Sequence, residues 1–585
     1  MRHDLLILFF ILLSSALMAD EHTNEAPSFK VQGIVTDEKG EGLPGASVWV
    51  KGTVVGAGTN AKGEFSFKLS SKNRCVLRVS FTGYEPRERE VTPGVDSLYH
   101  FVLEPSNNAL NEVVITGTRT LKPLKDVPVL TRVISSEDIA QVNPLDLQSL
   151  LEYEMPGLQF GLAHGSGLPE LKFQGSAGGY VLFMIDGERV AGEGSSNNID
   201  YNLIDMDNVE RIEIVKGPMS TLYGSQAMGG VVNIITKDAN RPFTGNVSVR
   251  YGNNDESKYS LSLGTKQGRF SALTSLSYRK RDAYALKDKE GQIEYSYYKD
   301  IYGRDSVVAD TSEKGMSSVN GFEIWQANQK LSYTFNENFR ISLNGAYYNN
   351  DVLEYVEQKE QDRFSNYSIN PRVYYAINDS HILDFSYVFE NYEKRYVYTT
   401  SLPSKKVFGD LTNTVRLNYT GYIHEKHTLT AGIEVNTQKL QHYWFDNGSG
   451  KKFDAQTYVL YLQEDYKVSD SFSVLAGVRS DCHSKYGFHA SPKISLMYKY
   501  GVLTLRGGYG MGFRIPSLKE LHSEYDMGGQ GFFMIYGNED LEPEISHQGT
   551  FSAEVTKGIF NGSVSGYYTR FFDEIALGLT SDGKD

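Results

Sequence analysis

The stretch RIEIVKGPMSTLYGSQAMGGVVNIITK, from Arg211 to Lys237, reads as two apolar strands joined by a glycine-rich turn. Ile212 and Ile214 alternate with charged residues, and Gly217 with Pro218 ends the first strand. A phosphate-binding loop is the alternative interpretation, but no Gly-Lys-Ser/Thr follows and the glycines do not open a long helix. The stretch therefore predicts part of a compact globular domain.

The rest of the chain is rich in residues that favour strands. Its 585 residues include 39 Tyr and 30 Phe, against 12 Met and 3 Trp. The length alone suggests about four domains, although large β-barrels run much longer as single units. A formal charge of −14 gives no support to nucleic-acid binding, which needs clustered Lys and Arg. We expect no nucleic-acid partner.

Residues 1–19 have a positive start, an apolar stretch and small residues, the pattern of a secretory signal peptide. An uncleaved anchor is the alternative, because Leu17 stands where a smaller residue is usual before Ala19. Beyond this segment no run reaches the roughly 18 apolar residues of a membrane helix, so a membrane-spanning form must be a barrel. Cys75 and Cys482 are too few and too distant for a disulfide framework.

Residues 29–104 contain short alternating strands separated by Gly, Asn and Lys-Gly turns, at the spacing of a small β-sandwich. This segment shows no nucleophile, paired carboxylates or metal-ligand spacing. GIVTDEKGEGLPGASVWVKGT and SFTGY resemble the carboxypeptidase-regulatory-like (transthyretin-like) domain. The resemblance implies a non-catalytic sandwich of the kind placed ahead of outer-membrane receptors in Bacteroidetes-type bacteria.

One extended apolar run, within residues 111–117, interrupts a polar linker. An unpaired strand in a linker can add itself to the edge of a partner's sheet. The alternative is a first strand of the next domain. The run resembles the TonB box of outer-membrane active transporters. The resemblance implies that TonB is a partner and that it is contacted by Glu112, Val113, Val114, Ile115 and Thr116.

Residues 125–237 mix helical and strand patterns. In VISSEDIAQVNPLDLQSLLEYEMPG, Asn143 stands at an N-cap position, Pro144 at the first helical position, and Leu147, Leu150 and Leu151 on one helix face. YVLFMIDGERV predicts an apolar strand that ends in an Asp-Gly turn.

PGLQF, LFMIDGERV, VERIEIVKGP and LYGSQAMGGVVNIITK, in this order, resemble the plug domain of TonB-dependent receptors. The resemblance implies an α+β domain that fills the lumen of a barrel of about 22 strands, which is too wide for side chains alone to fill.

Residues 238–585 give repeated alternating segments typical of a transmembrane β-barrel. In FSVLAGVR, for example, Phe472, Val474 and Val478 share one face, while Ser473 and Leu475 share the other. A soluble repeat protein is the alternative, which the preceding plug and signal disfavour. The predicted fold class is thus dominated by β-structure: an N-terminal β-sandwich, an α+β plug domain and a transmembrane antiparallel β-barrel.

The last segment is short for this architecture, since a barrel of about 22 strands would leave only about 16 residues per strand, turns included. The chain also ends in GLTSDGKD, without a terminal aromatic strand residue. We therefore expect that C-terminal strands are missing and that the barrel cannot close by itself, since open edges are not tolerated in lipid.

GYGMGFRIPSLKELH and MIYGNEDLEPE resemble the paired FRAP and NPNL boxes of haem receptors and, less strictly, of cobalamin and siderophore receptors. Ile515 departs from the first box, and Glu539 with Asp540 from the second. The boxes also read as strand ends around a loop, with a structural role in every branch of the family. The matching positions are Phe513, Arg514, Pro516, Asn538 and Leu541.

The resemblance also implies an axial histidine between the boxes and a second one at the plug apex. The matching residues are His522 and His164, the latter in GLAHGSGLP. Neutral imidazole is a good ligand for haem iron. The alternative is that each is a solvated loop histidine among the 12 in the chain. We expect no resident cofactor and no metal held by the protein alone, because haem would be the transported ligand.

The resemblance implies import of an iron chelate across the outer membrane of a Gram-negative bacterium, with haem favoured. The expected partners are TonB with its inner-membrane energising complex, outer-membrane lipid, and a small chelate or a haem-carrying protein. The alternatives are a siderophore or cobalamin importer, and a signalling or adhesive receptor that transports nothing. A longer glycan importer is disfavoured by length and by FRIPSLKEL. Nothing in the sequence supports an enzyme.

Overall fold

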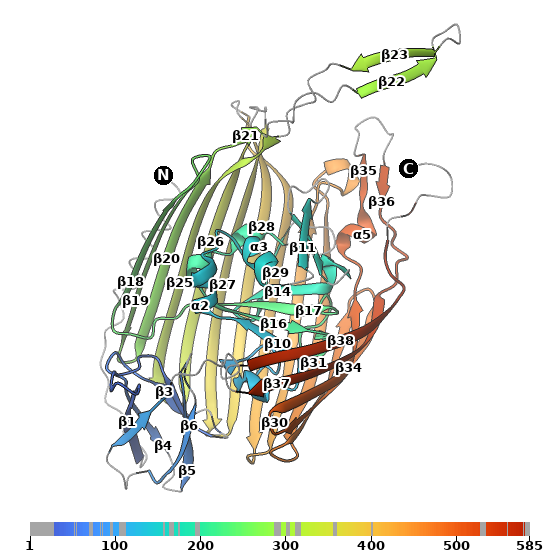
Figure 1. Ribbon diagram of the computed structural model, residues 1–585. Helices are drawn as coiled ribbons and strands as arrows, with labels where there is room; N and C mark the ends of the chain where they lie inside the picture. The colour runs from blue at the N-terminus through green and yellow to red at the C-terminus, as the bar shows by residue number, and fades with distance from the viewer. Residues whose placement is uncertain are drawn as a thin grey trace.

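The computed structural model describes residues 29–578 except for 52, 54, 70–73, 82–83, 85, 94–97, 105–112, 156–157, 163–168, 174–175, 193–198, 286–293, 300–304, 311–317, 355–359, 399–401, 527–533, 558–559 and 577. A small β-domain, a mixed domain and a large curved sheet follow one another, and the sheet wraps around the mixed domain (Figure 1). Within the described residues no helix has the length and apolar character needed to cross a membrane.

The N-terminal domain packs two sheets face to face, because its strands carry apolar residues at every second position. Val31, Val35, Phe65 and Phe67 are among its buried residues. The first sheet has the order β4-β1-β7 and the second β3-β2-β5-β6. The strands are β1 (Phe29–Thr36), β2 (Ser47–Val50), β3 (Gly56–Gly58), β4 (Glu64–Leu69), β5 (Cys75–Ser80), β6 (Arg87–Val91) and β7 (Tyr99–Val102).

The mixed domain is built on a five-stranded sheet of order β10-β16-β17-β14-β15, in which only β14 and β17 are parallel. Its strands are β10 (Thr131–Ile134), β14 (Val181–Ile185), β15 (Glu188–Arg189), β16 (Val209–Lys216) and β17 (Gly230–Thr236). A smaller sheet contains β11 (Leu158–Leu162), β12 (Pro169–Phe173) and β13 (Ser176–Ala177), and short 3-10 helices are η2 (Leu124–Asp126), η3 (Gly178–Tyr180), η5 (Tyr201–Leu203) and η6 (Met206–Asn208).

Two helices cover the sheet. The N-cap that the sequence predicted for the second helix, Asn143, is wrong. Asn143 ends α2 (Ser136–Val142) in the left-handed conformation, at φ 49°, which Asn tolerates. Asp146 caps α3 (Leu147–Glu154), because its side chain accepts a hydrogen bond from the Ser149 backbone N–H. The predicted apolar face is confirmed: Leu147, Leu150 and Leu151 are fully buried.

The quoted stretch forms β16, a turn containing the short helix α4 (Ser220–Tyr223), and β17. Gly224 ends α4 at φ +79°. A Cβ at this position would lie 2.6 Å from Nη2 of Arg479 on the barrel wall. Glycine is required here because the backbone is left-handed and because the turn approaches the barrel closely.

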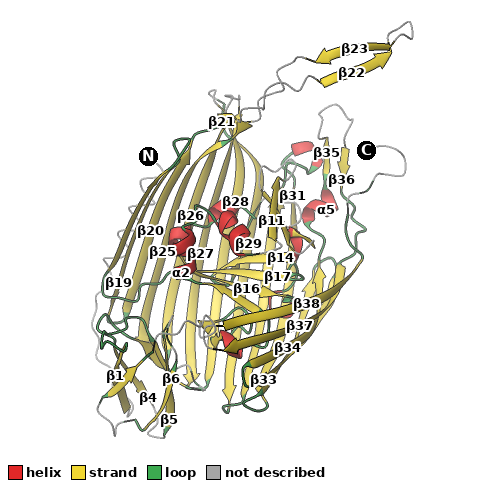
Figure 2. Ribbon diagram, in the orientation of Figure 1, coloured by secondary structure: helices red, strands yellow, loops and turns green. Residues whose placement is uncertain are grey.

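The barrel is a 15-stranded antiparallel sheet in which neighbours follow chain order, with β18 and β38 as its edges (Figure 2). Its strands are β18 (Thr244–Tyr251), β19 (Ser257–Gln267), β20 (Phe270–Arg281), β25 (Gly321–Asn336), β26 (Phe339–Leu353), β27 (Glu360–Asn378), β28 (His381–Tyr398), β29 (Lys405–Ile423), β30 (His427–Gln441), β31 (Lys452–Lys467), β32 (Phe472–His483), β33 (Gly487–Tyr500), β34 (Leu503–Arg514), β37 (Glu544–Lys557) and β38 (Phe560–Phe572).

The connections at the two ends of the barrel differ in length. Turns such as 268–269, 337–338 and 379–380 are tight, and the N-terminal domain lies at this end (Figure 1). The segments 282–320 and 515–543 at the other end carry small elements of their own. These are β21 (Tyr284–Ala285), β22 (Glu294–Lys299), β23 (Asp305–Asp310), β24 (Ser318–Val319), α5 (Leu518–His522), β35 (Glu524–Asp526) and β36 (Met534–Tyr536), and η7 (Asp446–Gly448) lies in the segment 442–451.

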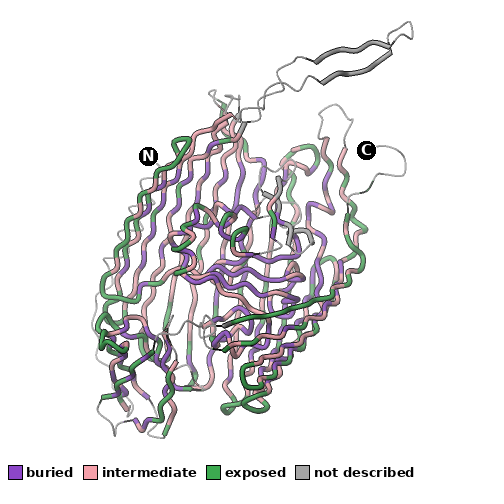
Figure 3. The backbone as a smooth tube through the Cα atoms, viewed as in Figure 1, coloured by how far each residue is buried: buried purple, intermediate pink, exposed green. Residues whose placement is uncertain are grey.

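Residues of lower and higher exposure alternate along the barrel strands (Figure 3), because successive side chains of a strand point to opposite faces. In β31, Leu460 is 60% exposed whereas Tyr461 is 1% exposed. In β32, Leu475 turns inward and packs against the mixed domain, while Val478 faces out. The outer face is therefore apolar and the inner face meets the enclosed domain, which confirms the predicted fold class.

Candidate functional site

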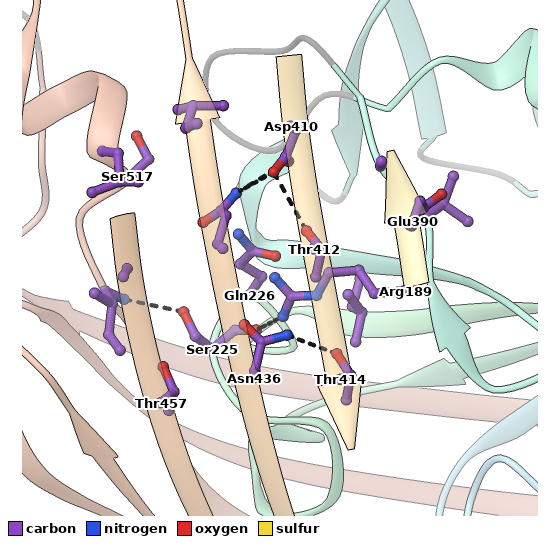
Figure 4. A pocket seen from close by; sticks show the side chains of 18 of the residues that line it. Arg189, Ser225, Gln226, Glu390, Asp410, Thr412, Thr414, Asn436, Thr457 and Ser517 are labelled. Carbon is purple, nitrogen blue, oxygen red and sulfur yellow. Dashed lines mark hydrogen bonds between the residues drawn. The ribbon is translucent and has the colours of Figure 1, made fainter. Parts of the chain in front are cut away.

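A cavity of about 310 Å³ lies between the mixed domain and the inner wall of the barrel (Figure 4). The mixed domain contributes the β14–β15 hairpin with Glu188 and Arg189, and the end of the quoted turn with Ser225 and Gln226. The barrel contributes β28 to β32, and the segment after β34 contributes α5. The cavity is therefore bounded by the enclosed domain, the wall and a long connection.

The barrel wall of the cavity is polar because every second residue of β29 and β30 faces inward. The Gln438 amide donates to both Asp410 carboxylate oxygens at 3.1 Å, and Asn436 Nδ2 donates to Thr414 Oγ1 at 2.8 Å. The inward residues are Asp410, Thr412, Thr414 and Arg416 in β29 and Glu434, Asn436, Gln438 and Leu440 in β30.

Ion pairs join the enclosed domain to the barrel wall along the cavity. The Arg416 guanidinium lies between Glu188 of the enclosed domain, at 2.9 and 3.0 Å, and Glu434 of the wall, at 2.7 Å. Arg479 pairs with Asp481 at 2.9 Å. All these side chains are largely shielded from water, so salt screens their attraction little. The ion pair between Glu188 and Arg416 therefore holds the β14–β15 hairpin to the barrel wall.

Two carboxylates that line the cavity are held by neutral donors. Asn366 donates to Glu390 at 3.0 Å, and Asp410 accepts from Gln438 and Thr412. Among the described residues, neither carboxylate has a Lys or Arg within ion-pair distance. Each therefore keeps acceptor capacity for N–H or O–H groups of a ligand.

Three histidines line the cavity, and their hydrogen bonds fix different tautomers. Nδ1 of His442 accepts from the Trp444 backbone N–H at 3.0 Å, and Nδ1 of His483 accepts from that of Lys485 at 3.2 Å. Burial, aided by Lys519 and Lys394, lowers the pKa of His442 to about 2. Neutral His442 therefore carries its proton on Nε2, as does neutral His483. That nitrogen is a donor and not a metal ligand.

His522 has the opposite arrangement. Its Nδ1 lies 2.9 Å from a carboxylate oxygen of Glu539, which can only accept, so Nδ1 carries the proton and Nε2 has a free lone pair. Its ring stacks on Phe453 at 3.8 Å. A carboxylate that orients an imidazole is typical of metal-binding histidines. His522 is the cavity histidine suited to bind iron, whereas His164 lies outside the described residues.

The two predicted boxes meet around a buried ion pair. Arg514 binds Glu544 through two nitrogens, at 2.7 and 2.8 Å, and Glu520 of α5 at 3.0 Å. Asn538 donates its backbone N–H to the carbonyl of Glu520, and Leu541 donates to that of Asn538. Phe513 is buried and Pro516 lines the cavity. In this arrangement the boxes hold the connection that carries His522.

The predicted linker strand is paired in the structure, against the expectation of an unpaired one. Val113 and Val114 form β8, which pairs with β9 (Lys122–Pro123). Val114 is fully buried in an apolar cluster of the enclosed domain, which explains the pairing. Thr116 is also fully buried, and Glu112 lies outside the described residues. The alternative interpretation, a first strand of the next domain, fits this conformation.

Sequence reasoning missed the carboxylates and ion pairs of the cavity. A usable signal was the run DLTNTVR in β29, where Asp410, Thr412, Thr414 and Arg416 alternate with other residues. Polar residues at every second position of a membrane strand mark the face toward the lumen. Pairing of this face with the enclosed domain depends on barrel register, which a single strand does not reveal.

Three family descriptions match the chain. Residues 280–585 match "TonB dependent receptor-like, beta-barrel", residues 123–231 match "TonB-dependent Receptor Plug Domain", and residues 31–115 match "CarboxypepD_reg-like domain". The first match alone covers more than half of the chain.

Curated relatives are similar over most of the chain. The iron-regulated outer membrane virulence protein of Vibrio cholerae is 25% identical over 489 residues, which cover 79% of this chain and 69% of that protein. The vitamin B12 transporter BtuB of Vibrio vulnificus is 25% identical over 451 residues, which cover 75% and 68%.

Solved structures share the fold. A double mutant of the ferric enterobactin receptor PfeA from Pseudomonas aeruginosa has a TM-score of 0.62 at 20% identity, covering 75% of this chain and 71% of that one. The siderophore receptor PirA from Acinetobacter baumannii has a TM-score of 0.59 at 17% identity, covering 76% and 71%.

Proposed function

The chain belongs to the family of TonB-dependent receptors of the Gram-negative outer membrane, which are not enzymes, and on this basis we propose that it imports a metal chelate. The observation that carries the proposal is the cavity between plug and barrel, lined by polar groups from both. Residues 113–116 precede the segment that matches the plug family and contact its sheet, where a periplasmic partner such as TonB can pull. The names of relatives support chelates as the ligand class.

The lining of the cavity favours a polar chelate, such as a siderophore or a corrinoid. Its wall offers Thr, Asn and Gln side chains, and Glu390 and Asp410 keep free acceptor capacity. A site built from hydrogen-bonding groups discriminates strongly against ligands that leave those groups unpaired. Amide, hydroxamate or amine N–H groups of a chelate would satisfy these carboxylates.

Haem is the second candidate, because of His522. Its Nε2 lone pair and its Glu539 partner suit an axial ligand of haem iron. In this version the second ligand is the predicted one, His164, which lies outside the described residues. A non-transporting signalling or adhesive receptor is a further alternative, which uptake measurements separate from an importer.

Binding to the purified full-length receptor tests the ligand class. Haemin, a ferric trihydroxamate, a ferric catecholate and cyanocobalamin are titrated against wild type, Glu390→Gln and Asp410→Asn. Glu464→Gln is the matched control, because Glu464 pairs with His427 outside the cavity. We expect one polar chelate to bind and both cavity variants to weaken it about tenfold or more, since a ligand donor loses a charged acceptor. Binding of none of the four would overturn the proposal.

A further inference from the structure

A second cavity, of about 20 Å³, lies between the plug and a different part of the barrel wall. The plug contributes the segment 128–130 and residues 216–218, where β16 ends. The barrel contributes the neighbouring strands β33, β34 and β37. This small cavity shares no lining residue with the larger one, so a role for it is independent of the proposed import.

The small cavity exists because one inward position of the wall has no side chain. Gly508 of β34 stands opposite Ser495 of β33 and Thr550 of β37. A Cβ at Gly508 would lie 3.3 Å from the hydroxyl oxygen of Ser495 and 3.0 Å from that of Thr550. Two hydroxyl groups therefore flank the space that a side chain at position 508 would fill.

Every charged residue that lines the small cavity is a cation. The cations are Lys216, Lys493 and Arg506, and no Asp or Glu occurs in the lining, all of which the structure describes. Ser552 lines the cavity as well, and its buried Oγ has no hydrogen-bond partner among the described residues. Hydroxyl and ammonium groups both donate hydrogen bonds. The lining therefore offers donors and positive charge, but no negative charge.

Lys493 is the cation with the poorest partner. Its side chain on β33 is 7% exposed, and its Nζ lies 2.9 Å from Sδ of Met219, the residue after Pro218 of the lining. A thioether is a weak acceptor, whereas an ammonium group has three donors. Within the part of the chain that the structure describes, no carboxylate is within ion-pair distance of this Nζ.

Other buried cations of the barrel wall have carboxylate partners. Arg506, in the same lining, pairs with Glu554 at 2.7 Å. Lys258 of β19, which is 3% exposed, pairs with Asp205 of the plug at 2.7 Å. Burying an unpaired charge is costly, so buried charges are normally paired. Lys493 therefore needs a partner that the described residues do not supply.

We propose that the small cavity binds one anion of the size of chloride, with Lys493 as its counter-charge and the cavity hydroxyls as hydrogen-bond donors. About 10–15 Å³ is enough for one water-sized species, so the cavity admits a monatomic anion but not phosphate or sulfate. A water molecule fits the same space, but it leaves the ammonium without a counter-charge. The bound anion keeps Lys493 charged beside the plug turn and so stabilises the plug against the wall.

Bromide soaks of crystals of the full-length receptor test occupation directly. Bromide carries the charge of chloride and scatters anomalously, so a bromide ion is distinguished from a water. We expect an anomalous peak in the small cavity of wild type. Lys493→Met keeps the length of the side chain but removes its charge, and Gly508→Ala fills the space between the hydroxyls while leaving Lys493 in place. Both variants should lose the peak.

Thermal unfolding in detergent measures the affinity in solution. Chloride replaces gluconate, which is too large for the cavity, at a constant ionic strength of about 0.15 M. An anion that binds the folded receptor alone raises Tm. We expect chloride to raise the Tm of wild type and to bind both variants about tenfold or more weakly, because charge-assisted hydrogen bonds are lost or misaligned. Lys258→Met is the matched control and should keep the chloride dependence, because Lys258 is paired with Asp205.

The wild-type measurements decide the proposal even if a variant does not fold. Solvent density without an anomalous signal would identify a bound water and overturn the proposal, as would the lack of any density. A bromide peak together with equal Tm values in chloride and gluconate would indicate an adventitious ion only, which also overturns it. Chloride dependence that survives in Lys493→Met and Gly508→Ala would place the anion elsewhere and contradict this site.

Discussion

At the scale of single residues, the chemistry of the cavity depends on which ring nitrogen of each histidine is already bonded. Backbone N–H groups occupy Nδ1 of His442 and His483, whereas a carboxylate occupies Nδ1 of His522. The resemblance to the paired boxes indicated His522, but it could not reveal this difference. The tautomer follows from loop contacts with Trp444, Lys485 and Glu539.

Haemin spectra test the role of His522. If haem binds, His522→Ala should shift its Soret band and weaken binding about tenfold or more, because an axial ligand is lost. Glu539→Gln should give a smaller effect through a less basic imidazole. His483→Ala is the matched control and should leave the spectrum unchanged. An unchanged spectrum in His522→Ala would contradict haem ligation by this residue.

The pH dependence of haem release follows from the same residue. Burial outweighs Glu539 and lowers the pKa of His522 below its ordinary value of about 6.5. The neutral, ligating form therefore persists below pH 6.5, and haem should be released only as the pH falls through the lowered value. A titration of the Soret band measures the midpoint. Release above pH 7 would show that another group controls binding.

The ion pair between Arg514 and Glu544 tests the structural interpretation of the boxes. Both side chains are almost fully buried. Glu544→Ala should lower the free energy of unfolding by about 3 kcal/mol, the lower end of the range for a broken buried pair, because Arg514 keeps Glu520 as its carboxylate partner. Guanidinium unfolding in detergent measures it, with exposed Glu542→Ala as control. Equal midpoints for the two variants would contradict a structural role.

At the scale of elements, the alternation of strand residues and the helical periodicity could be predicted from the sequence. The helix caps and the pairing of β8 could not. The amphipathic face of α3 was predicted because Leu147, Leu150 and Leu151 recur at helical spacing. Its cap was misplaced because Asn143 and Asp146 both suit an N-cap, and only tertiary packing chooses between them. The two residues after β8 are held by Glu213, nearly 100 residues away.

Val114→Pro tests β8 as the element on which TonB acts. Proline cannot donate a backbone hydrogen bond and fits poorly inside a paired strand. We expect uptake to be abolished while chelate binding at the cell surface stays within about twofold of wild type, since Val114 is not among the residues that line the cavity. Val102→Pro, in β7 of the N-terminal domain, is the control for a general loss of folding. Equal loss of binding and uptake would contradict the TonB-box assignment.

At the scale of the whole molecule, the plug is fastened to the barrel mainly by polar contacts. Lys258 of β19 pairs with Asp205 at 2.7 Å, and both side chains are buried. Asp200, also fully buried, accepts from Tyr348 and Tyr392 of the wall at 2.7 and 3.0 Å. Discrete polar contacts of this kind can exchange partners one at a time. Such contacts would suit the proposed importer, whose plug has to rearrange inside the barrel.

The order of sandwich, plug and barrel was predictable from motifs, since each resemblance covers a continuous segment. The cavity was not, because it brings together β14–β15, β28–β32 and α5 from positions far apart in the sequence. Arg416 is an example. From the sequence it is one of many residues that face the lumen, and its ion pair with Glu188 follows only from the position of the enclosed domain in the barrel. Residues that act across domains carry no local signal.

The most direct test of the central claim is accumulation of a radiolabelled chelate by cells that express the full-length receptor. The chelate is the one that binds the purified protein, and isogenic strains with and without TonB are compared. We predict accumulation only in the strain with TonB, its loss in Val114→Pro, and equal surface binding in all three. Equal accumulation without TonB, or binding without accumulation in the strain that has TonB, would contradict active import by this receptor.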